Sequence, residues 1–163
     1  MIDIEITDHQ SIASIDPKPI QTLLKHVFET EGFPEAEISI ALVDNQQIHK
    51  VNRDFLNHDY PTDVISFVLN GSEDSVSHNH DHADPDFPEP LIGEVIVSVE
   101  TAAGMAAENN WCIASEVLLY CLHGSLHLCG YDDLVASERN RMRERERFYL
   151  LPLGLDPQVD PSD

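Results

Sequence analysis

Four short segments with strand patterns, each followed by a turn or a helical segment, restrict the fold of this chain more than any other feature. Residues 2–6 alternate isoleucine with polar side chains, as a half-buried strand does. Residues 37–43, 64–69 and 91–99 carry longer apolar stretches of strand length. The segment 64–69 is apolar enough to predict a central strand. These four segments predict one sheet.

Apolar residues at helical spacing fill most of the remaining chain. Pro19 suits the first turn of one helix, Asp44 or Asn45 can cap a second, and Gly130 suits the end of a fourth. The segments with this pattern are 19–31, 45–55, 101–110, 115–128 and 137–151. The order of elements predicts an α+β fold with a mixed four-stranded sheet and about five helices.

The length of 163 residues suits one domain, which we place at residues 1–151. Hydrophobic residues make up 42% of the chain and charged residues 24%, as in globular proteins. No apolar run approaches the ~20 residues of a membrane span, and the N-terminus lacks the pattern of a secretory signal. We therefore expect a cytoplasmic protein with no membrane partner. No glycine-rich phosphate loop follows a strand, so no nucleotide cofactor is expected.

Two segments have little apolar content. Residues 71–90 are rich in acidic residues, histidine and proline, and predict an exposed insertion loop. Its residues His78, His80 and His82 either collect a metal ion weakly or belong to a solvated loop without a specific site. Residues 152–163 predict a flexible C-terminal tail.

The chain is strongly acidic, with nine basic and thirty acidic residues and a net charge of −21. This balance argues against a broad electrostatic surface for nucleic acid. Five of the nine basic residues, however, lie between Arg139 and Arg147. Arginine at every second position predicts charges scattered around a helix, which either form local ion pairs or contact RNA.

The most informative stretch is HGSLHLCGYDD, residues 123–133. His123 and His127 are four residues apart in a predicted helix, so both imidazoles lie on one face and can bind one ion. Gly130 lets the chain reverse, and a carboxylate at Asp133, or at its rival Asp132, can supply a third ligand. Three protein ligands leave one position open, as in catalytic sites. The alternative is a pair of core histidines held by ordinary hydrogen bonds.

The same stretch resembles the signature of the YbeY family, HGxLHLxGYDH. Residues 61–67 (PTDVISF) are similar to the family's PTDVLSF segment, residues 93–98 (GEVIVS) are similar to its GDIxIS strand, and Asn52 matches an asparagine ahead of PTDV. These segments occur in the family's order and cover most of residues 37–150.

The resemblance implies an α+β domain with a metal cleft at the HxxxH helix. It implies one zinc ion per chain, held by His123, His127 and Asp133. The implied activity is metal-dependent cleavage of single-stranded RNA in 3′-end maturation of small-subunit rRNA and in ribosome quality control. The implied partners are ribosomal RNA and the small ribosomal subunit, with ribosomal proteins as further candidates for an acidic chain. Asp63 and Glu94 are candidate catalytic residues because they lie in the matching segments.

Two positions depart from the family pattern. Asp133 stands where the family has a third histidine, and aspartate is itself a competent zinc ligand. Leu56 stands where the family has an arginine, and Arg53, three residues earlier, can substitute for it if the segment is helical. The loss at Leu56 supports an alternative function, a non-catalytic ribosome-assembly factor stabilised by its metal.

Overall fold

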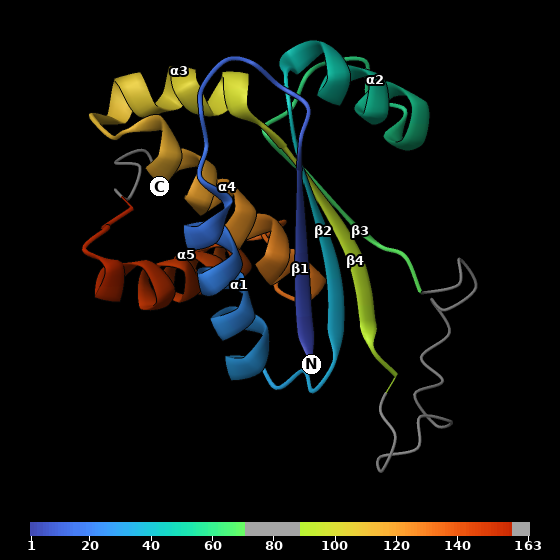
Figure 1. Cartoon of the computed structure of the whole chain (residues 1–163), viewed down its shortest axis with the longest axis vertical. Helices are drawn as coiled ribbons and strands as arrows, with labels where there is room; N and C mark the ends of the chain where they lie inside the picture. Colours follow the sequence, from blue (N-terminus) through green and yellow to red (C-terminus); the bar gives the residue numbers. More distant parts are fainter. Residues whose placement is uncertain (71–88, 158–163) are drawn as a thin grey trace.

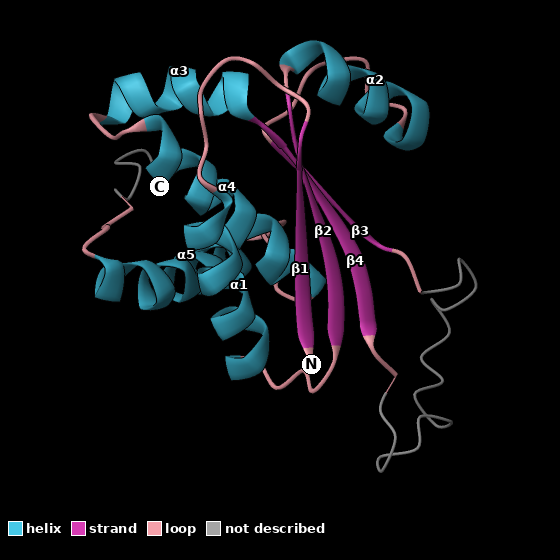
Figure 2. Cartoon of the chain, viewed as in Figure 1, coloured by secondary structure: helices cyan, strands magenta, loops and turns pink. Residues whose placement is uncertain are grey.

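The four apolar segments form one mixed sheet, seen nearly edge-on in Figures 1 and 2. The strands are β1 (Ile2–Asp8), β2 (Ala36–Val43), β3 (Val64–Val68) and β4 (Leu91–Ser98). Their order is β1-β2-β4-β3, with β1, β2 and β4 parallel and β3 antiparallel to β4. The predicted mixed sheet is confirmed. The prediction that 64–69 is central is wrong, because β3 lies at the edge and owes its apolar content to helices on both faces.

The computed structural model describes residues 1–70 and 89–157. Within them lie five α-helices and a short 3₁₀ helix, which confirms the predicted α+β class. Their bounds are α1 Pro17–Thr30, α2 Asn45–Leu56, α3 Val99–Asn109, α4 Ile113–Leu128, α5 Ala136–Leu150 and η3 Leu151–Leu153.

Local capping explains where the first two helices begin. The Asp16 side chain accepts a hydrogen bond from the Lys18 backbone N–H at 3.1 Å, so α1 begins at Pro17 rather than at Pro19. Asp44 and Gln47 form a reciprocal capping box at the start of α2. These polar contacts satisfy backbone donors that a helix cannot satisfy by itself.

The two faces of the sheet are covered by different helices (Figure 1). Helices α1 and α4 bury the main core against one face, where Val95 and Val97 of β4 point. Helix α2 covers a smaller cluster on the other face, around Ile48, Ile65 and Ile96. Because successive side chains of a strand alternate between faces, even- and odd-numbered residues of β4 have different neighbours.

A glycine allows α4 to lie very close to the sheet. A Cβ atom at Gly124 would lie 2.6 Å from Val95 Cγ1 and 3.0 Å from both Val64 Cγ2 and Ser66 Oγ. The Ser66 hydroxyl also donates to the Gly124 carbonyl at 2.9 Å. This contact fixes the histidine-bearing part of α4 beside β3 and β4.

The chain after α5 turns back on that helix. Leu155 packs against the main core, and its N–H donates to the Leu150 carbonyl at 3.2 Å. Arg147 and Asp156 form an ion pair at 3.1 Å. Thus residues 152–157, which the sequence places in a flexible tail, hold defined contacts. His78, His80 and His82 lie outside the described residues. No helix in the described ranges is both long and apolar enough to cross a membrane.

Candidate metal centre

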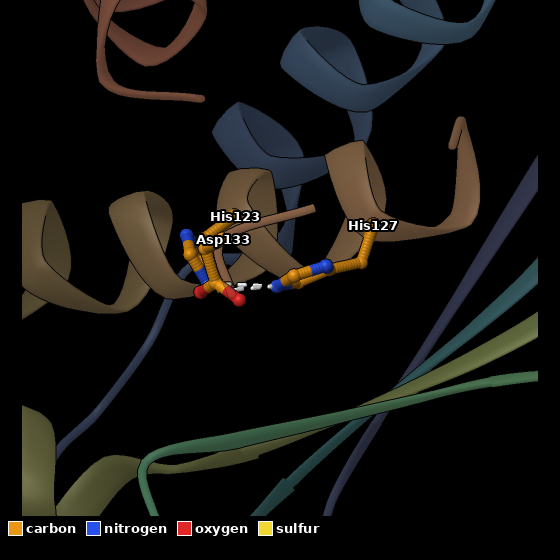
Figure 3. A group of neighbouring side chains, drawn as sticks. All are labelled: His123, His127 and Asp133. Atoms are coloured by element: carbon orange, nitrogen blue, oxygen red, sulfur yellow. Dashed lines mark hydrogen bonds and ion pairs between the residues drawn. The ribbon is translucent and has the colours of Figure 1, made fainter. Parts of the chain in front are cut away.

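The last two turns of α4 and the loop after it bring three predicted ligands together (Figure 3). His123 and His127 project from one face of α4. Gly130 has φ of 105°, a conformation that side chains rarely adopt, and it reverses the chain after the helix. Asp133 thereby returns to the two imidazoles, as the sequence predicts.

The distances among the three ligand atoms suit a small tetrahedral metal ion. His123 Nε2 and His127 Nε2 lie 3.1 Å apart, and Asp133 Oδ2 lies 3.4 Å from the first and 3.5 Å from the second. Ligand atoms bound tetrahedrally at zinc distances are separated by about 3.3–3.4 Å. The observed triangle matches this separation, so the group can hold a metal ion.

Hydrogen bonds on the far side of each ring aim the lone pairs inward. His127 Nδ1 lies 2.9 Å from the Tyr131 carbonyl, and His123 Nδ1 lies 2.7 Å from Glu146 Oε1. Both partners are acceptors, so each Nδ1 donates its proton and each Nε2 keeps a lone pair. Two lone pairs facing each other at 3.1 Å repel unless a cation lies between them. The donor set therefore fits a metal ion.

The charges around His123 and its burial have opposite effects on the pKa of its imidazole. Burial by itself would lower the pKa of the imidazole. The hydrogen bond and charge of Glu146, together with the charges of Asp133 and Asp63, outweigh it and raise the pKa. The site is thus an anionic environment that attracts a positive charge to the imidazole pair.

The rival ligand Asp132 points elsewhere. Its Oδ1 accepts a hydrogen bond from the Asp133 backbone N–H at 2.9 Å, and its side chain is exposed. It lines a separate hollow with Glu31 and Arg141. Asp133, which the family resemblance favours over Asp132, is the carboxylate that reaches the histidines.

Two of the three ligands, His123 and Asp133, line a cleft of about 340 Å³ between α4, α5 and the start of β3. Asp63, a predicted catalytic residue, lines this cleft with His123 and Asp133. Its Oδ1 also accepts hydrogen bonds from the Val64 N–H at 2.8 Å and the Thr62 hydroxyl at 3.3 Å. Oδ1 of Asp63 therefore accepts hydrogen bonds from its sequence neighbours, while the residue also lines the cleft.

Glu94, the other predicted catalytic residue, is not brought to the cleft. It pairs with Phe67 across the sheet and shares its face with Ile96, whereas Val95 faces α4. Alternation along β4 places the carboxylate on the face opposite the histidines.

Two further carboxyl groups, those of Glu116 and Glu146, line the cleft. Glu146, from α5, is 8% exposed and orients His123. Glu116 is 3% exposed, and its Oε2 has no hydrogen-bond partner among the described residues. Burial, aided by the charge of Asp63, raises its pKa against the lowering effect of an Asn109 hydrogen bond. Glu116 shares a helix face with His123, a signal visible in the sequence, whereas Glu146 gives no such signal.

The arginines of α5 are not scattered as predicted. Arg139, Arg143 and Arg147 all line the cleft. Arg145 instead binds Glu31 at 2.7 Å, and the Arg141 guanidinium lies over the Tyr131 ring at 5.3 Å. At 100° per residue, arginine at every second position produces two opposed faces rather than an even distribution.

The family arginine has no replacement from α2. Leu56 is the last residue of that helix and is 41% exposed. Arg53 is helical, as its proposed role required, but its Nε lies 3.3 Å from Asp54 Oδ1 and it is not among the residues that line the cleft. The cationic groups of the cleft come from α5 instead.

Comparison with known proteins identifies the family of this chain. The family model described as Endoribonuclease YbeY matches residues 4–154. Proteins named Endoribonuclease YbeY from Desulfitobacterium hafniense and Bacillus velezensis are 36% and 34% identical to this chain. The first match covers 83% of each chain, and the second covers 93% of this chain and 96% of the relative.

A solved structure shares the fold. The solution structure of TM1509 from Thermotoga maritima aligns over 100% of this chain and 99% of its own, with a TM-score of 0.57 and 22% identity. The family model and the relatives' identity over most of the chain confirm the resemblance found in the sequence. The chain belongs to the YbeY family of endoribonucleases.

Proposed function

We propose that this chain is a metal-dependent endoribonuclease that hydrolyses single-stranded RNA. Its proposed role is 3′-end maturation of small-subunit rRNA and ribosome quality control, with the small ribosomal subunit as its partner. An enzyme with this role works in the cytoplasm, where ribosomes are assembled. Family membership supports RNA cleavage, since the relatives are named as endoribonucleases.

The observation that carries the proposal is the ligand triad at the wall of a cleft that also holds cationic side chains. Two imidazoles and one carboxylate lie 3.1–3.5 Å apart, at separations that suit zinc. Three protein ligands leave a position for water, which distinguishes a catalytic zinc from a structural one. We therefore propose one zinc ion per chain.

Each residue of the site has a proposed task. His123, His127 and Asp133 would hold the ion, while Glu146 and the Tyr131 carbonyl keep the Nδ1 protons in place. When bound, the ion supplies Lewis acidity toward a water molecule or a phosphate oxygen. Hydrolysis forms a bond from a water oxygen to phosphorus and breaks the bond from phosphorus to the leaving ribose oxygen. Asp63 lines the same cleft and is the proposed acceptor of the water proton.

The decisive experiment compares two adjacent carboxylates. Metal content by mass spectrometry and cleavage of a single-stranded RNA are measured for wild type, Asp133→Ala and the matched control Asp132→Ala. We expect wild type and Asp132→Ala to carry about one zinc ion per chain and to cleave, as a three-ligand site predicts. Asp133→Ala should lose both. Retention of zinc and cleavage by Asp133→Ala would refute the ligand set.

A second candidate is a non-catalytic ribosome-assembly factor whose metal is structural. Leu56 in place of the family arginine, together with the net charge of −21, favours it. An acidic chain is suited to contact basic ribosomal proteins. Wild-type protein that carries zinc but cleaves no RNA, even with small ribosomal subunits present, would establish this function in place of the nuclease.

A further inference from the structure

The cationic residues that line the cleft all come from one face of α5. Arg139, Arg143 and Arg147 are spaced by four residues, so successive side chains are turned by only about 40° around the helix. Four residues advance the helix by about 6 Å. This spacing is comparable with that of successive phosphates along an extended strand. We call these three residues the arginine face.

The arginine face lies directly beside the metal ligands. Glu146, which orients His123, is the residue before Arg147 and three residues after Arg143. At the other end, Arg139 Nη1 donates to the Leu134 carbonyl at 3.3 Å, and Leu134 follows Asp133. Arg147 thus directly follows the residue that orients His123, and Arg139 contacts the residue that directly follows Asp133.

The contacts of the two outer arginines leave them able to bind a ligand. Arg147 pairs with Asp156 at 3.1 Å, and the two side chains are 44% and 60% exposed to solvent. An exposed ion pair is weak, so a phosphate oxygen can displace Asp156. Arg139 holds its present partner through one terminal nitrogen of five possible donors. A guanidinium group binds phosphate with paired, charge-assisted hydrogen bonds.

The opposite arginines of the same helix have a different task. Arg145 is half-buried and donates to Glu31 Oε1 at 2.7 Å, next to the Tyr149 hydroxyl that donates to the same oxygen at 2.6 Å. Arg141 stacks over Tyr131. This second pair fastens α5 to the end of α1 and to the loop that precedes α5.

The strong negative charge of the chain does not extend to the cleft once a divalent ion is present. Four carboxyl groups line it, those of Asp63, Glu116, Asp133 and Glu146, and a fifth, that of Asp156, pairs with Arg147. Three guanidinium groups and an ion of charge +2 against these five carboxylates give 3 + 2 − 5 = 0, in a chain whose net charge is −21. A polyanion therefore meets no net negative charge in this cleft, whereas the acidic residues elsewhere in the chain repel it.

Apolar residues of the same cleft suit unpaired bases. Met105, Leu119 and Tyr120 contribute apolar surface to the same cleft. Single strands present unstacked bases that pack on aromatic and apolar side chains, while their phosphates follow cationic groups. A cleft of about 340 Å³ can admit part of a single strand.

We propose that Arg139, Arg143 and Arg147 bind the phosphate backbone of single-stranded RNA next to the metal ligands. This assignment rests on the proposed nuclease function and names the residues that hold its substrate. The arginine face supplies the cationic contact that Leu56 cannot supply.

The test measures RNA affinity as a function of salt. Zinc-loaded full-length protein is titrated against a fluorescently labelled single-stranded oligoribonucleotide, with the RNA checked for integrity on a gel. The variants are the triple Arg139→Gln, Arg143→Gln, Arg147→Gln, the single Arg143→Gln, and the matched control Arg141→Gln. Zinc content and thermal unfolding verify that each variant retains its fold.

We expect the triple variant to bind at least about tenfold more weakly, because three phosphate contacts are lost. The slope of log affinity against log salt should fall by about 2 in the triple variant and by about 0.7 in Arg143→Gln, at about 0.7 per phosphate on a single strand. Arg141→Gln should match wild type. Unchanged affinity and slope in the triple variant, or an equal loss in Arg141→Gln, would overturn the proposal. Competition by an acidic peptide as effective as RNA would also overturn it.

Cleavage assays separate this proposal from the nuclease function. If wild type cleaves RNA and the triple variant binds RNA as wild type does, the role of the arginine face is refuted and the nuclease function stands. If RNA binding is salt-sensitive and depends on the arginine face but wild type cleaves RNA under no condition, the nuclease function is refuted. The arginine face then stands as an RNA-binding surface.

Discussion

Replacement of Gly124 by alanine tests how closely α4 lies on the sheet. The new Cβ would lie 2.6 Å from Val95 Cγ1 and 3.0 Å from Val64 Cγ2, and Val95 is fully buried. Valine side chains are stiff because of branching at Cβ, so neither can move aside cheaply. Gly104 in α3 is the matched control, since a Cβ there meets nothing within 4 Å.

The expected magnitudes follow from two opposing effects. Alanine stabilises a helix interior by about 0.8–1 kcal/mol relative to glycine, and this gain applies at both positions. Overpacking costs about 1–3 kcal/mol, and the shortest contact places Gly124→Ala near the upper end. The difference between the variants is thus about 3 kcal/mol. With about 2–4 °C per kcal/mol for a domain of this size, Gly104→Ala should melt about 2–4 °C higher than wild type and Gly124→Ala about 4–8 °C lower.

Thermal unfolding followed by circular dichroism, at fixed protein and zinc concentrations, measures both shifts. Val95→Ala removes the atom nearest to the new Cβ, so Gly124→Ala should cost less in that background than in wild type. Equal melting temperatures for Gly124→Ala and Gly104→Ala would refute the close approach of α4 to β4. That result would also mean that Gly124 does not account for the position of the histidines beside β3.

Three further predictions concern the carboxyl groups around the site. Glu146→Gln weakens the hydrogen bond to His123 Nδ1 and should reduce zinc affinity by about 10- to 100-fold, measured by competition with a chelator; unchanged affinity would contradict its orienting role. Glu31→Gln weakens charge-assisted contacts to Arg145 and two tyrosine hydroxyls, so the free energy of unfolding in urea should fall by about 1–3 kcal/mol. An unchanged free energy of unfolding would mean that this network does not stabilise the fold. Glu116→Gln should raise the free energy of unfolding at neutral pH and have a smaller effect below pH 4.5, the ordinary pKa of the carboxyl. The sign follows because the pKa of Glu116 is raised in the folded state, so wild type loses stability as the pH rises from the unfolded to the folded pKa. A stability difference between the variant and wild type that shrinks with rising pH would contradict this reasoning.

Much of the candidate site could be predicted because its ligands come from one short segment. His123 and His127 are related by helix periodicity, and Gly130 marks the reversal that returns Asp133. Such relations depend on local backbone geometry, which a sequence pattern expresses directly. The family resemblance already favours Asp133 over Asp132, and the loop conformation agrees, since the two adjacent side chains point in different directions and Asp133 reaches the histidines.

The elements and the class of fold could be predicted from the sequence, because periods of two and of 3.6 residues record which side chains are buried. The histidine pair could be predicted in the same way. The distant residues that join this pair depend on the tertiary structure. It placed Glu94 on the far face of the sheet, and it brought Glu146 and the arginine face of α5 into the cleft. The reason is that the rotation of a docked helix and the register of a strand depend on contacts between segments far apart in the chain, which no local pattern records.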